Sequence, residues 1–114
     1  MSNVKQQGVL PAEFLVSEGN GQISRERIIV KAGPALPAGR LLGVTSTGEY
    51  APYDNAANDG SEVAAAILYA PLAASDVPRP ATGIVRLAEV VGGLLTGLDA
   101  AGRTDLAERH VVIR

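Results

Sequence analysis

Few side chains in this chain of 114 residues could carry out acid–base or nucleophilic chemistry. His110 is the sole histidine, and it begins an apolar run, where a histidine at a strand edge is the simpler interpretation. A serine nucleophile needs a base and an orienting carboxylate. The serines fall in predicted turns or near the N-terminus, and none has a Gly-x-Ser-x-Gly context. The sequence therefore predicts that the protein is not an enzyme.

The carboxylates and glycines also lack the patterns that hold metals or phosphates. Four carboxylates are grouped, but the alternating oxygen ligands and closing Glu of a calcium-binding loop are missing, so a solvated loop is the better interpretation. The glycines of residues 39–43 and of Gly92-Gly93 precede neither Lys-Ser/Thr nor a predicted helix start. We therefore expect no metal and no cofactor. The grouped carboxylates are Glu49, Asp54, Asp59 and Glu62.

Composition narrows the function classes further. The formal net charge is -2 and the basic residues are dispersed, so nothing indicates nucleic-acid binding. The absence of cysteine excludes disulfide scaffolds and thiolate zinc sites. The longest apolar run, residues 63–74, is far shorter than the roughly 20 residues of a membrane span. The N-terminus lacks the apolar segment of a secretory signal. We expect a soluble protein that is used without export.

The pattern of the chain favours a mostly β fold with short helical segments (α+β). A turn at Ser46-Thr47-Gly48 separates two strands of a predicted hairpin. One strand is expected to continue across residues 83–91, and Thr104 is the expected N-cap of a short helix over residues 104–109. The stretch from Val63 to Leu72 is expected to be core. The other predicted strands cover residues 27–31, 40–45, 49–53, 63–69 and 110–114.

Residues 1–22 differ from residues 23–114, which we predict to be one compact domain. No strand or helix period links them to the body, so they are expected to form a flexible N-terminal arm. Either this is a frayed tail, or it is an arm that orders on a partner. Apolar residues favour the second interpretation, and the single Phe of the chain lies among them, outside the predicted core. These residues are Val9, Leu10, Phe14, Leu15 and Val16.

The order of several short segments resembles the phage lambda-type head decoration proteins, which are capsid-stabilising proteins. The resemblance covers roughly residues 28–114. It implies a small β domain that forms trimers on the outer surface of the expanded phage head, after assembly in the host cytoplasm. The implied partner is the major capsid protein, whose subunits the trimers cement against the pressure of packaged DNA. The segments are AGPALPAGRLLG (32–43), GEYAPY (48–53), DGS (59–61), AAIL (65–68), RLAEV (86–90) and Leu94-Leu95.

Two hypotheses follow for the function. In the first, the five apolar residues of the arm contact the capsid, and a chain lacking residues 1–16 folds but no longer decorates shells. The arm would add a strand to a sheet edge on the shell. In the alternative, the segment Ala38-Gly39-Arg40-Leu41-Leu42 is similar to the turn of small β-clip modules that bind carbohydrate or another small ligand. That alternative predicts a concave polar site.

Overall fold

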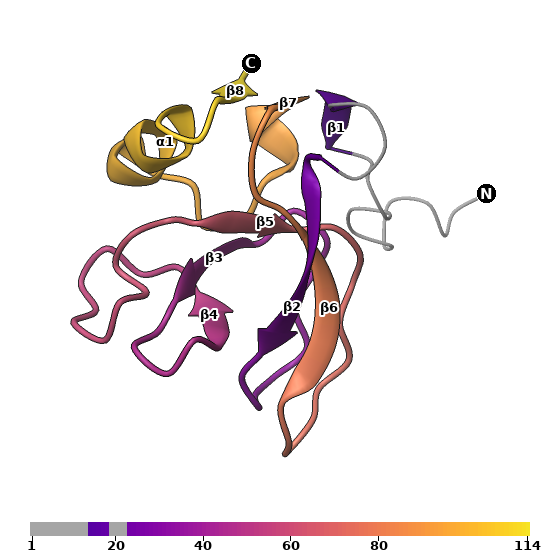
Figure 1. Ribbon diagram of the computed structural model, residues 1–114, viewed down its shortest axis with the longest axis vertical. Coiled ribbons are helices and arrows are strands. Elements are labelled where there is room, and N and C mark those ends of the chain that lie inside the picture. The colour runs from indigo at the N-terminus through magenta and orange to yellow at the C-terminus, as the bar shows by residue number, and fades with distance from the viewer. Residues whose placement is uncertain (1–13, 19–22) are drawn as a thin grey trace.

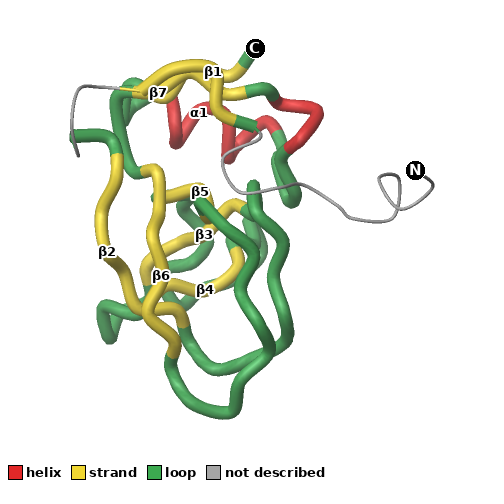
Figure 2. Tube along the Cα trace, turned by 90° about the vertical axis from the view of Figure 1, so that its right-hand side faces the viewer, coloured by secondary structure: helices red, strands yellow, loops and turns green. Residues whose placement is uncertain are grey.

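The computed structural model describes residues 14–18 and 23–114, and its strands form a barrel and a small sheet (Figures 1 and 2). The closed barrel has the order β2-β4-β3-β5-β6, and the three-stranded sheet has the order β1-β7-β8. The prediction of a mostly β fold with short helical segments is confirmed. The barrel strands are β2 (Arg25–Val30), β3 (Leu41–Val44), β4 (Tyr50–Pro52), β5 (Ala66–Leu68) and β6 (Arg79–Ile84). The other elements are β1 (Leu15–Glu18), β7 (Ala88–Val90), η2 (Gly92–Leu94), α1 (Ala100–Ala107) and β8 (Val111–Ile113).

Strands β2 and β6 form the longest pairing of the barrel, antiparallel from Arg25↔Ile84 to Val30↔Arg79. Side chains alternate along a strand, so Ile28 and Val30 are buried while Ile29 is exposed. The predicted hairpin is also present, since β3 pairs antiparallel with β4 across the turn that ends in Gly48. Strand β5 is buried along its whole length, as predicted. The expectation that all of Val63–Leu72 is core is wrong at both ends, because Val63 is 49% exposed and Pro71 lies at the surface.

Alternation in β3 and β5 divides the apolar residues between two cores. Leu41 and Ile67 point into the first core, which lies between the barrel and the elements β1, β7, α1 and β8. Leu42 and Leu68 point into the second core, together with Ile28 of β2. A single layer of two short strands therefore separates the two cores.

The expected single strand over residues 83–91 is two strands that belong to different sheets. Strand β6 ends at Ile84 in the barrel, and β7 begins at Ala88 in the small sheet. Between them, Leu87 has a φ of 53°, which an extended strand does not allow. The Ser24 hydroxyl donates a 2.7 Å hydrogen bond to the Leu87 carbonyl and holds this bend. The bend could not be predicted from the sequence, because apolar residues continue on both sides of it.

The helix is longer than predicted and begins earlier. Its N-cap is Asp99, whose side chain accepts a 2.7 Å hydrogen bond from the Gly102 N–H. Thr104 lies inside α1 and donates to the Ala100 carbonyl. The predicted start at Thr104 was therefore wrong by about one turn. Asp is at least as good an N-cap residue as Thr, but Gly97 and Gly102 on either side of it weakened the helical signal.

Candidate functional site: the N-terminal strand and its sheet

Phe14 lies in the core of the domain. Its side chain is fully buried in the cluster that also contains Leu41, Val90 and Leu106. Its carbonyl oxygen accepts a 2.8 Å hydrogen bond from the N–H of Val91. The expectation that the single phenylalanine lies outside the core is therefore wrong. The contacts that hold it come from residues far along the chain, which a local sequence period does not reveal.

The four residues after Phe14 form β1, which pairs antiparallel with β7. The pairing shifts register between Leu15 and Ser17, and neighbouring side chains at this shift differ in burial. Leu15 packs against the core, whereas Val16 is 52% exposed. Val9 and Leu10 lie outside the described residues. Of the predicted arm residues, the structure thus places Phe14 and Leu15 against the protein's own core and leaves Val16 at the surface.

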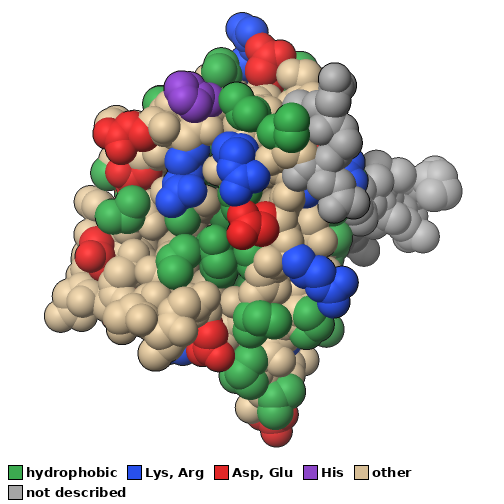
Figure 3. Space-filling view, viewed as in Figure 1, with side chains coloured by type: hydrophobic (Ala, Val, Ile, Leu, Met, Phe, Trp, Pro, Cys, Tyr) green, Lys and Arg blue, Asp and Glu red, His purple; other side chains and the backbone are tan. Residues whose placement is uncertain are grey.

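The outward face of the small sheet carries a polar centre with apolar neighbours. Glu89 of β7 accepts a 2.8 Å hydrogen bond from the Ser17 hydroxyl and forms an ion pair with Arg114. These hydrogen bonds, that of Arg114 first, lower the pKa of Glu89. Leu87 and Val112 are 45% and 48% exposed beside them. On the face shown in Figure 3, acidic and basic side chains are interspersed and do not separate by sign.

A shallow hollow of about 310 Å³ lies on this outward face. Neither Leu87 nor Val112 was predicted to line it: Leu87 falls in a segment that was predicted as a strand with one exposed side, and Val112 falls in the apolar run of residues 110–114. The alternation of exposed Leu87 with buried Ala88, and of exposed Val112 with buried Val111, is the signal that could have found them. The lining residues are Ser17, Glu18, Leu87, Ala88, Glu89, His110 and Val112.

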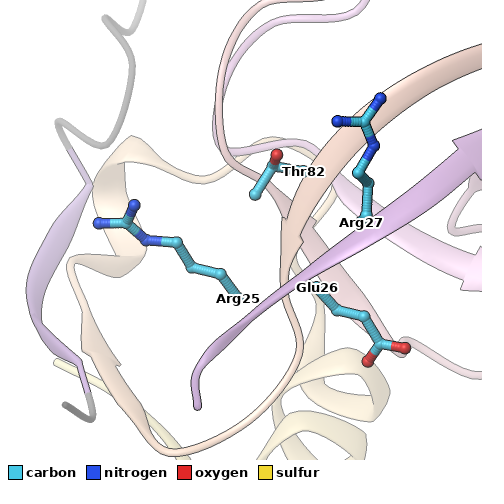
Figure 4. Close-up of a pocket in the computed structure, with 4 residues that line it drawn as sticks. All are labelled: Arg25, Glu26, Arg27 and Thr82. Atoms are coloured by element: carbon cyan, nitrogen blue, oxygen red, sulfur yellow. The ribbon is translucent and has the colours of Figure 1, made fainter. Parts of the chain in front are cut away.

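A second hollow, of about 230 Å³, lies along β2 and β6 (Figure 4). It is lined by Arg25, Glu26, Arg27 and Thr82, and the side chains of Glu26 and Arg27 leave β2 in different directions. The guanidinium of Arg25 is already bound to Glu18. Within the described part of the chain, no hydrogen bond or ion pair holds the guanidinium of Arg27. This hollow thus presents the Arg27 cation and the Thr82 hydroxyl.

The grouped carboxylates serve the loop that contains them. Asp59 accepts hydrogen bonds from the Ser61 hydroxyl and N–H at 2.6 and 3.0 Å, which lower the pKa of Asp59. Glu62 accepts a 2.8 Å hydrogen bond from the N–H of Gly60. Among residues 14–18 and 23–114, no three His, Cys, Asp or Glu side chains are close enough together to hold a metal ion.

His110 has a backbone role at the junction of α1 and β8. Its φ is 63°, its N–H donates to the Ala107 carbonyl, and its own carbonyl accepts from Ala88. The imidazole is exposed at the rim of the hollow on the small sheet. Over the described ranges, no helix combines the length and apolar character needed to cross a membrane.

Comparison with known proteins gives one family. The model of the bacteriophage lambda head decoration protein D family matches residues 4–111, which is nearly the whole chain. No curated protein matches. The matched range includes residues 4–13, the barrel, and the small sheet up to the first residue of β8.

Proposed function

This chain belongs to the bacteriophage lambda head decoration protein D family, and we propose that it binds as trimers to the expanded phage head and stabilises it against the pressure of packaged DNA. The family is structural, and its members decorate the phage capsid. The match over residues 4–111 is the observation that carries the proposal. The partner in this proposal is the major capsid protein, and the site of action is the outer surface of the virion.

Strand β1 supports a contact with the shell by strand addition. It is an edge of the order β1-β7-β8, so β7 occupies one side of it and its other side has no partner strand among the described elements. An exposed strand edge presents unpaired N–H and C=O groups to which another chain can pair. Main-chain hydrogen bonds then supply affinity, and alternate side chains supply fit.

The burial of the arm residues assigns them two roles in this proposal. Val9, Leu10 and Val16 contact the shell. Phe14 and Leu15 fix the arm to the domain, because their side chains pack against the core. Removing residues 1–16 would therefore also remove a core side chain, so a truncation after residue 13 is the cleaner test of the arm.

In a trimer, three arms act together on the shell. Ordering a chain segment costs about 1–2 kcal/mol per residue, so a single arm binds weakly. Three arms on one trimer raise the effective concentration of each and offset that cost. Binding to the expanded shell alone shifts the equilibrium toward that state by mass action.

The test is co-sedimentation of the protein with expanded, undecorated shells of its cognate major capsid protein. We expect saturable binding near one copy per capsid subunit, and weak binding to unexpanded shells. A chain lacking residues 1–13 should remain folded and lose most of its affinity. Undiminished binding of this truncated chain would refute the role of the arm. If the intact protein does not bind, a small ligand-binding module becomes the better hypothesis, and melting temperatures with sugars would examine it.

A further inference from the structure

Two loops form an exposed apolar surface that the proposed arm contact does not use. We define the proline–alanine lobe as residues 32–38, which follow β2, and residues 70–78, which precede β6. The lobe contains one charged residue, Asp76. Figure 3 shows hydrophobic side chains gathered toward the lower end of the view. Nine exposed apolar residues belong to the lobe: Ala32, Pro34, Ala35, Pro37, Pro71, Ala73, Ala74, Val77 and Pro78.

Hydrogen bonds fix the two loops against each other. Main-chain bonds of 2.9–3.0 Å join Gly33 to Ser75 and Leu36 to Leu72, in both directions. The guanidinium of Arg79 is 7% exposed and donates to three carbonyls of the lobe and its base. These carbonyls belong to Lys31, Pro34 and Ala73, at 2.7, 2.9 and 2.7 Å.

Such a surface is built to bind at low entropic cost. Pro and Ala side chains lose almost no rotamer freedom when they become buried, and the loops are ordered before any contact is made. Surface loops of a monomeric protein are usually polar, and a contiguous exposed apolar patch marks an interaction site. The lobe therefore has the composition and rigidity of an interface.

The outer part of the lobe, where Gly33 pairs with Ser75, lies far from the strand that carries the arm. Glu18 at the end of β1 is bound to Arg25 at the start of β2, while the lobe begins beyond Val30 at the other end of β2. A six-residue strand is about 20 Å long. Figures 1 and 2 both show β1 and β7 at one end of the molecule and these loops at the opposite end. A shell surface bound at β1 is therefore not the surface that covers the lobe.

We propose that the proline–alanine lobe is where copies of this chain contact each other in the trimer. The inference rests on the proposed function for the trimer itself. Around a rotation axis, the same residues of each copy come together, so a charge there meets its like. Like charges placed opposite each other cost several kcal/mol in an interface. A surface of nine apolar residues and one carboxylate is suited to a second copy of itself. A different protein would more often be recognised through complementary charges.

A like-charge test uses two exposed valines. Val77 in the lobe is 58% exposed, and Val63 outside it is 49% exposed. We expect Val77→Asp to lower the affinity for expanded shells at least tenfold, because each trimer then brings three added carboxylates together. The control Val63→Asp should bind like the wild type. Equal melting temperatures of the two variants confirm that both are folded. Unchanged binding of Val77→Asp would overturn the inference.

Cross-linking gives a second readout that does not depend on shells. The chain has no cysteine, so Val77→Cys and Val63→Cys each introduce a single reactive thiol. With a short bis-maleimide, we expect covalent dimers of Val77→Cys on shells and in concentrated free protein, and none of Val63→Cys. Cross-links from Val77→Cys to the capsid protein, or no cross-links between copies, would overturn the inference. If the wild type fails to bind shells but free Val77→Cys still cross-links, only the decoration proposal fails.

Discussion

The guanidinium of Arg25 donates to both carboxylate oxygens of Glu18, through Nη2 at 2.5 Å and Nε at 2.9 Å. The same guanidinium lies 4.5 Å from the ring centroid of Tyr69. The hydrogen bond to Glu18 is the main cause of a raised pKa for Arg25. Glu18 ends β1 and Arg25 begins β2, so this pair joins the small sheet to the barrel where the arm is attached.

The Glu18→Gln variant should loosen β1 without unfolding the domain. The amide keeps the size of the side chain but removes the charge that the bidentate pair uses. We expect hydrogen exchange at the β1 amides to accelerate several-fold, with exchange in β2 and β6 unchanged. Glu26→Gln is the matched control, since it breaks the more exposed pair with Arg86. Equal exchange at β1 in both variants would show that the pair with Arg25 does not hold β1.

Phe14→Ala should destabilise the protein by about 3–5 kcal/mol, because it leaves a cavity in the core. The side chain is fully buried in the cluster between the barrel and the small sheet. Urea unfolding monitored by circular dichroism measures the loss. Val16→Ala is the control, and it should cost less than about 1 kcal/mol because that side chain is half exposed. A similar small loss for Phe14→Ala would mean that β1 is detached in solution.

The hairpin at residues 41–52 and the buried strand β5 could be predicted because each depends on neighbouring residues. Gly48 has the positive φ that a tight turn needs, and Ala66–Leu68 lies in an apolar run bounded by turns. The division of residues 79–90 into β6 and β7 could not be predicted. It depends on Ser24, which holds the bend at Leu87 from a position 63 residues earlier.

The candidate site was harder to predict than the fold. The capsid contact predicted for the apolar residues of the arm stays a prediction, and the structure places Phe14 and Leu15 against the core and Val16 at the surface. The burial of Phe14 depends on partners in β7, α1 and β8. Of the lobe, only residues 32–38 belong to a segment that resembles the family, and the Val63–Leu72 stretch was expected to be core, since Pro and Ala carry no functional signal on their own. The order of the lobe could not be predicted, because it depends on the buried side chain of Arg79, which binds both loops.

Alkaline pH should destabilise the fold through Tyr53. Its hydroxyl donates a 2.8 Å hydrogen bond to Asp99, and burial, with a smaller effect of this carboxylate, raises the pKa of Tyr53 to about 12. The unfolded chain has a tyrosine pKa of about 10, so the neutral phenol stabilises the folded state. This contribution is complete below about pH 10 and is lost as the pH rises toward about 12.

Urea unfolding at several pH values above about pH 8 measures this dependence. We expect Tyr53→Phe to be less stable near neutral pH and to lose less stability on going to high pH. Some dependence should remain, because burial also raises the pKa of Tyr50. Tyr69→Phe is the control that keeps the hydrogen bond to Asp99. An identical alkaline decrease in wild type and Tyr53→Phe would contradict the assignment.

Gly43→Ala should be among the most damaging small substitutions in the barrel. A Cβ at this position would lie 2.6 Å from the Cα of Ser61 and 2.7 Å from the carbonyl oxygen of Val63. Both contacts are with backbone, so the loop must move, and we expect a loss of about 1–3 kcal/mol or more. Gly93→Ala has open space around its Cβ and should change stability by less than about 0.5 kcal/mol. Thermal unfolding of the two variants provides the comparison.

The anchoring of Phe14 also determines how the domain meets a mechanical load. In the proposed function, a capsid subunit that moves outward under the pressure of packaged DNA pulls on the arm bound to it. Tension along β1 acts across its hydrogen bonds with β7, so these bonds must fail together, as in shear. The same tension must also draw a phenyl ring out of the core. An arm joined to the domain by an exposed hinge would instead come away one bond at a time. The burial of Phe14 thus increases the force needed to detach the short strand β1 from the domain.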